Sequence, residues 1–337
     1  MKTRSPGLKG ARGAAGPGPF QPDARCAECL MKLSRDVSAT AAPNDHTLQE
    51  AMVFKARRFI REARDAGLSS PETANRILRM IRERTGVHDP FRSFKRLEMR
   101  HAREAYSRLR PRFDGNLRSL ASLAALGNSL DFFRDPKEAF DELPPHLEGG
   151  VPFHHDDLDR LEEALGEGLG LVLYLTDNAG EIFFDRPLYE EIRRRAKRTV
   201  LVVKGGPGLN DLTRDELEAE GLAGAFQEVA DTGTDGAGVD WRCASDAFHR
   251  LLARADLVLS KGMANFETLL DRDLQAAVLY LFKVKCEPIR EHLNAPAESY
   301  WALWRDGHKV TGDRETSPHE ASAPECCSTA GQGEKTP

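Results

Sequence analysis

The chain has 337 residues, of which 40% are hydrophobic and 30% are charged, and its net charge at pH 7 is −5. These values are ordinary for a soluble globular protein, and the charge gives no reason to expect nucleic acid as a partner. No apolar run approaches the ~20 residues of a membrane span. The amino terminus lacks the apolar core of a signal peptide. We therefore expect a cytoplasmic protein with no membrane contact.

The two ends of the chain are predicted to lie outside the folded core. Residues 1–22 are rich in Gly, Pro, Ala and basic residues, and residues 306–337 are polar, with Gly, Ser, Thr and Pro. Segments of this kind cannot bury enough apolar surface to offset the entropy of ordering. We expect both to be disordered tails.

Residues 23–150 are predicted to form an all-helical domain. Thr47 opens a capping-box pattern, and Ser70 followed by Pro71 marks a second helix start, with Ser70 as the cap. Further helices are expected over 94–110 and 117–130, and the latter is apolar enough to be buried.

Arginine is concentrated in this helical region. From Lys55 to Arg118 there are eighteen Lys or Arg residues against eight Asp or Glu. A basic helical face can bind phosphates, including those of nucleic acid. No helix-turn-helix spacing or zinc-finger pattern accompanies it, so we interpret it as a solvated surface.

After residue 150 the pattern changes to alternating strands and helices. Apolar runs predict buried strands at 171–176, 199–203 and 256–259, and helical patterns follow at 181–197, 213–221 and 244–254. Such alternation predicts βαβ units and a parallel sheet. A long final helix is expected over 274–292. Residues 151–305 are thus predicted to form a Rossmann-like α/β domain, a parallel sheet with helices on both faces.

Polar and glycine residues follow each predicted strand. Ligands of open α/β sheets bind beyond the carboxyl ends of the strands, so Asp177, Asn178, Asp211 and Lys261 are expected to converge there. Two carboxylates and an amide oxygen suit a divalent cation and leave positions open to a phosphate and a nucleophile. A lysine beside them would stabilise charge on a transferring phosphoryl group. The open alternative for Asp177 and Asn178 is an Asx turn or a helix cap.

Competing motifs are absent or weak. Lys204 precedes its glycines, so this loop is not a Walker A motif, and the chain has no G-x-S-x-G or H-E-x-x-H motif. A single C-x-x-C, Cys26 to Cys29, could supply thiolates to a metal together with Cys286, but incidental structural cysteines are an equal alternative. The histidine and aspartate pairs at 154–157 are predicted to form a helix-start loop at the wrong end of the sheet.

Several long motifs, in the same order, resemble the DUF89 family, the ARMT1-like damage-control phosphatases. They are Asp177–Ile182, Val203–Asp211, Ser260–Glu267 and Phe282–Cys286, with the C-x-x-C at Cys26, Asp89–Phe91 and Ala125–Asp131. The resemblance covers about residues 24–297, and its cysteines look like those of the mainly prokaryotic subfamily. Met263-Ala264 departs from it, because glutamine-glycine is common there in relatives.

The resemblance implies a helical domain packed on a Rossmann-like domain and metal-dependent hydrolysis of small phosphorylated metabolites. It implies Mn²⁺, Co²⁺, Ni²⁺ or Mg²⁺, held by Asp177, Asn178 and Asp211, and it places the cysteines near the site. The implied substrate-binding residues are Asn128, Lys261, Gly262, Asn265 and one of Lys283 and Lys285. Two other functions stay open: an S-adenosylmethionine-dependent carboxyl methyltransferase, described for a distant relative, and a non-enzymatic thiol or metal-binding module. The sequence does not specify an oligomeric state.

Overall fold

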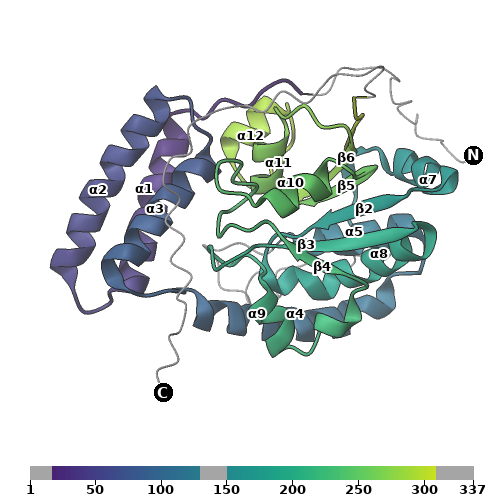
Figure 1. Cartoon of the computed structure of the whole chain (residues 1–337), viewed down its shortest axis with the longest axis horizontal. Coiled ribbons are helices and arrows are strands. Elements are labelled where there is room, and N and C mark those ends of the chain that lie inside the picture. The colour runs from purple at the N-terminus through teal and green to yellow at the C-terminus, as the bar shows by residue number, and fades with distance from the viewer. Residues whose placement is uncertain (1–16, 130–149, 309–337) are drawn as a thin grey trace, which may run out of the picture.

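Helices build the first part of the described chain and a seven-stranded sheet builds the second, in a computed structural model that describes residues 17–129 and 150–308 (Figure 1). The helices of the first part are α1 (Ala24–Ala41), α2 (His46–Asp65), α3 (Ser70–Thr85), α4 (Arg92–Leu109), the short 3₁₀ helix η1 (Arg110–Arg112) and α5 (Leu117–Gly127). None of the helices in the described ranges is long and apolar enough to cross a membrane.

Side chains cap two of these helices at positions other than those predicted. Asp45 caps α2 by accepting a hydrogen bond from the backbone N–H of Leu48. Thr47 lies inside this helix, so the capping box predicted at Thr47 is wrong. Ser69 caps α3 in a complete capping box with Glu72, one residue before the predicted cap. In both cases an earlier side-chain oxygen reaches the unpaired N–H groups of the first turn.

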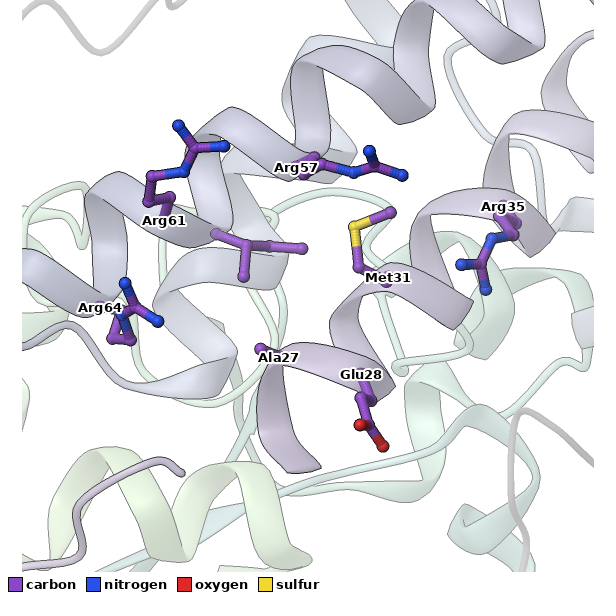
Figure 2. A pocket seen from close by; sticks show the side chains of 8 residues that line it. Ala27, Glu28, Met31, Arg35, Arg57, Arg61 and Arg64 are labelled. Carbon is purple, nitrogen blue, oxygen red and sulfur yellow. The ribbon is translucent and has the colours of Figure 1, made fainter. Parts of the chain in front are cut away.

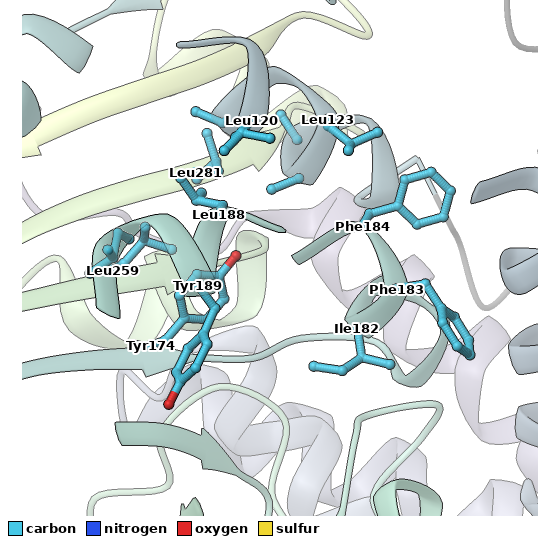
Figure 3. Close-up of a cluster of buried hydrophobic side chains, with 14 of the residues drawn as sticks. Leu120, Leu123, Tyr174, Ile182, Phe183, Phe184, Leu188, Tyr189, Leu259 and Leu281 are labelled. Carbon is cyan, nitrogen blue, oxygen red and sulfur yellow. The ribbon is translucent and has the colours of Figure 1, made fainter. Parts of the chain in front are cut away.

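Helices α1, α2 and α3 form a core of their own, built around Val37, Met52 and Ile77. In contrast, α4 and α5 share a core with the sheet. Figure 3 shows Leu120 of α5 near Leu281 of a strand, and Leu123 and Tyr174 belong to the same core. The sequence-based boundary near residue 150 therefore falls after two helices that are packed on the sheet.

The sheet has the strand order β1-β7-β6-β5-β2-β3-β4. Its strands are β1 (Phe153–Asp156), β2 (Leu171–Leu175), β3 (Arg198–Val203), β4 (Val229–Asp231), β5 (Leu257–Lys261), β6 (Ala277–Lys283) and β7 (Tyr300–Arg305). Strands β6, β5, β2, β3 and β4 are parallel, whereas β7 runs antiparallel to β6 and parallel to β1. The predicted Rossmann-like architecture is confirmed, with a mixed rather than fully parallel sheet.

Helices cover both faces of the sheet. Alternate residues of β2 belong to different cores, because Val172 and Tyr174 face one layer and Leu173 faces the other. The first layer contains α4, α5, α7 (Leu158–Glu167), α8 (Ile182–Arg195) and α9 (Arg214–Ala219), and the second contains α10 (Asp246–Leu252), α11 (Met263–Leu269) and α12 (Glu287–His292). Short 3₁₀ helices lie at Ala179–Glu181 (η2) and Ala223–Ala225 (η3).

The predicted final helix over 274–292 is wrong. The structure has strand β6 at Ala277–Lys283 and only a short helix, α12, at Glu287–His292. The run from Val278 to Phe282 is buried on both faces of a central strand, and so reads as continuously apolar. Periodicity cannot distinguish such a run from a buried helix.

Three smaller predictions also differ from the structure, one at β1 and one at the inner end of each predicted tail. The segment 154–157 lies mostly in β1, not in a helix-start loop. Within the predicted 1–22 tail, Phe20 is buried on the second layer, and its ring meets His292 edge-on at 5.4 Å. Past β7, the backbone of His308 donates to Leu274. Residues 1–16 and 309–337, and Leu130 of the predicted 117–130 helix, lie outside the described residues.

Candidate active site

The loop after β2 holds the first part of the site. Asp177 follows two residues after the buried strand end at Leu175, and is itself 9% exposed. Asn128, at the end of α5, donates from Nδ2 to Asp177 Oδ2 at 2.9 Å. On the other side Gly262 has a φ of +79°, and a Cβ there would lie 1.9 Å from Asp177 Oδ2. Only a glycine at position 262 leaves room for this carboxyl group.

The loop after β3 lies directly against this one. Asn178 and Asp211 form an isolated antiparallel bridge, and the backbone N–H of Leu212 donates to the carbonyl of Asp177 at 2.9 Å. Asp211 is 4% exposed. The structure therefore brings together, at the carboxyl edge of the sheet, the three residues expected to hold a cation.

Both carboxyl groups lie where two negative charges are unfavourable. Burial, with the charges of Glu181 and Asp211, raises the pKa of Asp177 from 3.8 to about 7. Burial also raises the pKa of Asp211, opposed by the charge of Lys204, whose Nζ atom lies 3.7 Å from Asp211 Oδ1. That oxygen is buried and accepts no hydrogen bond from the described residues. A bound cation would satisfy it and offset both charges.

The donor set fits a hard divalent cation. Two carboxylates with one amide oxygen are ligands that such ions take, and they leave coordination positions open. In the part of the chain that the structure describes, no group of three or more His, Cys, Asp or Glu side chains is arranged to hold an ion. A cation held by Asp177 and Asp211 would therefore need a further ligand, and the amide oxygen of Asn178 is a suitable one.

Lys261, at the end of β5, is fully buried. Its Nζ atom donates to Glu181 Oε2 at 2.7 Å, Asp185 Oδ1 at 2.6 Å and the carbonyl of Ala124 at 3.0 Å. Although burial opposes it, these two carboxylates hold the pKa of Lys261 above its ordinary range. An ammonium group has three donors, so none is left for a substrate phosphate.

Glu181 links this lysine to the two amides of the site. Its Oε1 atom accepts hydrogen bonds from Asn128 Nδ2 and Asn178 Nδ2, both at 2.7 Å. Holding the Nδ2 atom in this way turns the other end of the Asn178 amide, its oxygen, away from Glu181. Glu181 is fully buried and belongs to the DUF89-like motif, but it was not among the predicted site residues.

Asn265 and Lys204 brace the strand ends behind the site. Asn265 Nδ2 donates to the carbonyls of Thr176 at 3.0 Å and Lys261 at 2.7 Å, so it ties the end of β5 to the residue after β2. Its Oδ1 atom accepts from Lys204 Nζ at 3.3 Å. Asn265 was expected to contact substrate, yet these contacts use its amide for structure. Lys204, also absent from the predicted set, places positive charge beside Asp211.

Lys283, at the end of β6, and Lys285, two residues later, interact with different acidic residues. Lys283 Nζ forms an ion pair with Glu298 and lies 5.6 Å from the ring centre of Tyr300. The charge of half-buried Lys285 acts on Asp177, where it opposes the rise in pKa. Of the two, Lys285 is therefore the one whose charge acts on the carboxyl groups.

Glu98 of α4 joins both site loops and was missed. Its Oε1 atom accepts from the backbone N–H of Gly180 at 2.9 Å, and its Oε2 atom accepts from Asn210 Nδ2 at 3.1 Å. Burial raises the pKa of Glu98 to about 8. One sequence signal could have revealed it: Glu98 falls in the stripe of α4 that buries Met99 and Ala102.

The three predicted cysteines come within electrostatic reach of one another. Burial raises the pKa of Cys286 to about 12, with smaller contributions from Glu267, Cys26 and Cys29. A thiol with a raised pKa stays protonated at neutral pH and is a poor nucleophile and metal ligand. Glu267 lies two residues after Asn265 in α11.

Buried carboxyl groups, an amide and lysines gather at the carboxyl edge of a Rossmann-like sheet, a set of groups that suits proteins that bind a cation and an anionic ligand. The family comparison is more specific. Residues 23–300 match the model of the damage-control phosphatase ARMT1-like domain, so the chain belongs to this family.

Comparisons with individual relatives support the same family assignment. The chain is 29% identical over 272 residues to a damage-control phosphatase of Archaeoglobus fulgidus, covering 78% of this chain and 92% of the relative. It is 27% identical over 275 residues to one of Pyrococcus horikoshii, covering 80% and 93%. The crystal structure of a DUF89 family protein from Pyrococcus horikoshii matches with a TM-score of 0.75 at 25% identity, over 84% of this chain and 99% of that one. The predicted family and enzyme class, a phosphatase, are confirmed.

Proposed function

We propose that this phosphatase hydrolyses phosphomonoesters of small metabolites with a divalent cation held by Asp177, Asn178 and Asp211. The observation that carries the proposal is a pair of buried carboxyl groups, Asp177 and Asp211, close enough for the charge of one to raise the pKa of the other. One oxygen of this pair, Asp211 Oδ1, accepts no hydrogen bond from the described residues. When bound, the cation would supply positive charge that polarises the phosphoryl oxygens.

The neighbouring residues then take roles that follow from their contacts. We assign Lys261 to positioning, because it holds Glu181 and has no remaining donor. Gly262 gives clearance beside Asp177, since its own N–H already donates to the carbonyl of Leu281 at 3.2 Å. Asn128 fixes the Asp177 carboxyl group by a hydrogen bond from α5.

The proposal is tested by hydrolysis of p-nitrophenyl phosphate in the presence and absence of divalent ions. We expect no turnover after chelation and recovery with at least one of Mn²⁺, Co²⁺, Ni²⁺ and Mg²⁺, because the two carboxylates alone repel a phosphate. The same ion should raise the Tm of the wild type but not that of Asp211→Asn. Full activity in chelator would reject the cation. A screen of sugar phosphates and nucleotides then ranks substrates.

A second prediction distinguishes Lys283, the last residue of β6, from Lys285, which follows the strand. We expect Lys285→Gln to raise KM for p-nitrophenyl phosphate by roughly tenfold, because the variant loses one charged contact to the phosphate. Lys283→Gln should leave KM within about twofold, since Lys283 pairs with Glu298. Inhibition by inorganic phosphate should weaken in parallel with KM. The reverse ranking would assign the phosphate contact to Lys283.

A further inference from the structure

A pocket of about 440 Å³ lies between α1 and α2 (Figure 2). Its walls carry four arginines, Arg35 from α1 and Arg57, Arg61 and Arg64 from α2. The apolar residues Met31 and Ile60 are also part of its lining. The volume is that of a site for a small organic molecule.

Three of the four arginines are arranged along one side of α2. Arg57 and Arg61 are one turn apart, Arg64 follows in the next turn, and Arg35 faces them from the other helix in Figure 2. All four are exposed, whereas Ile60 is buried and Met31 is half-buried. A ligand in this pocket would therefore meet guanidinium groups at the rim and apolar side chains below them.

These charges are largely uncompensated. Among the described residues, no carboxylate lies within ion-pair distance of Arg35, Arg57 or Arg61, and Arg64 has only the exposed Asp65, at 3.6 Å. The single acidic side chain in the lining, Glu28, forms no ion pair with a described residue. Like charges one helical turn apart destabilise a helix, so the arrangement has a cost unless an anion binds.

Some arginines of the helical region outside the pocket are paired with carboxylates. Arg58, next to Arg57 but outside the pocket lining, donates to Glu62 at 2.6 Å. Arg79 of α3 pairs with Asp235 at 2.8 Å and Asp240 at 2.7 Å. Unpaired arginines also occur elsewhere in the region, as on α4, and what distinguishes Arg35, Arg57, Arg61 and Arg64 is that they line one pocket together with apolar side chains.

We propose that this pocket binds a small organic polyanion, with phosphate groups on the arginines and an apolar or ring portion against Met31 and Ile60. The planar guanidinium fork matches phosphate oxygens in pairs. The arginines gather around one open pocket of about 440 Å³, a size that suits a small molecule, and the net charge of −5 opposes a polymeric nucleic acid. The site is separate from Asp177 and does not depend on the cation proposed there.

The test is isothermal titration with ATP as the probe, in chelator so that no cation recruits ATP to the Asp177 site. We expect saturable binding to the wild type and to Arg58→Gln, the matched control on the same helix. The double variant Arg57→Gln/Arg61→Gln should bind at least about tenfold more weakly. It should hydrolyse p-nitrophenyl phosphate at the wild-type rate, which also shows that it is folded.

Two further ligands show which part of ATP the pocket recognises and whether it prefers nucleic acid. Tripolyphosphate should bind several-fold more weakly than ATP, because it cannot use the apolar part of the pocket; equal affinity would overturn the organic portion of the proposal. A short single-stranded oligonucleotide that binds far more tightly than ATP, and loses that advantage in the double variant, would replace the small ligand with nucleic acid. Equal ATP binding by the wild type and the double variant, or none by the wild type, would overturn the proposal.

Discussion

Asp177→Asn should abolish phosphatase turnover and yet raise the Tm of the metal-free protein. We expect kcat/KM for p-nitrophenyl phosphate to fall by about three orders of magnitude, because the variant loses a charged ligand of the cation that polarises the phosphate. The fold should survive, since the new amide can still accept the hydrogen bond from Asn128.

The stability effect follows from the pKa. The pKa of Asp177 in the folded protein is raised from 3.8 to about 7, so its folded state binds a proton more tightly than the unfolded chain does. Stability is therefore lost as the pH rises between these two values, and the penalty is present in full above about pH 7. The variant lacks this penalty. Melting curves in chelator at pH 8 should show a higher Tm for Asp177→Asn than for the wild type.

Asp215→Asn is the matched control, because it makes the same chemical change on the exposed side of α9, four residues after Asp211. It should change neither turnover nor Tm appreciably. Undiminished turnover by Asp177→Asn, with any of the four ions, would remove Asp177 from the reaction and with it the proposed cation site.

The strands could be predicted where each one is bounded by a clear change in composition. β2, β3 and β5 are short apolar runs that end in polar or glycine residues, and all three predictions are confirmed within a few residues. The apolar run of β6 is also bounded, by Gln275 and Lys283, but periodicity alone does not distinguish it from part of a buried helix. β7 becomes a strand only by pairing with β6 and β1, and β1 is distant in the sequence. No local pattern in 300–305 reveals that pairing.

The site illustrates the same limit. The rule that ligands bind at the carboxyl ends of strands selects Asp177, Asn178 and Asp211, and the structure brings them together. The rule gives the position of a residue and not the direction of its side chain. Lys261 shares a face of β5 with Leu257 and Leu259, which pack in the layer of α5 and α8.

Alternation along β5 could therefore have predicted that Lys261 points into this layer. It could not have predicted the carboxylates that meet Lys261 there, since those come from η2 and α8. The role of Glu98 is harder still to predict, because its two hydrogen-bond partners, Gly180 and Asn210, lie more than eighty residues away in the sequence. Buried polar networks of this kind are fixed by tertiary contacts.

Lys261→Met should produce the largest loss of stability of any single change in this network. It would leave two buried carboxyl groups, Glu181 and Asp185, without their cation, and the removal of one partner from a buried ion pair costs about 3–5 kcal/mol of unfolding free energy. Turnover should fall by about a hundredfold or more, because Glu181 would no longer hold the amides of Asn128 and Asn178 in place.

The loss should depend on pH in a defined direction. Even beside Lys261, burial raises the pKa of Asp185 to about 6, and loss of the lysine would raise it further. Because protonated carboxyl groups do not need the lysine, the deficit should be small near pH 5 and grow toward pH 8. Denaturant unfolding at both pH values measures it, with exposed Lys197→Met as the control.

A triple variant distinguishes this charge imbalance from a simple loss of packing. Adding Glu181→Gln and Asp185→Asn to Lys261→Met removes the unpaired charges, so most of the lost stability should return at pH 8. If the triple variant stays as unstable as Lys261→Met, the lost stability comes from poorer packing around position 261 and not from unpaired charge. If Lys261→Met itself unfolds like the wild type at pH 8, the lysine does not hold Glu181 as the contacts indicate.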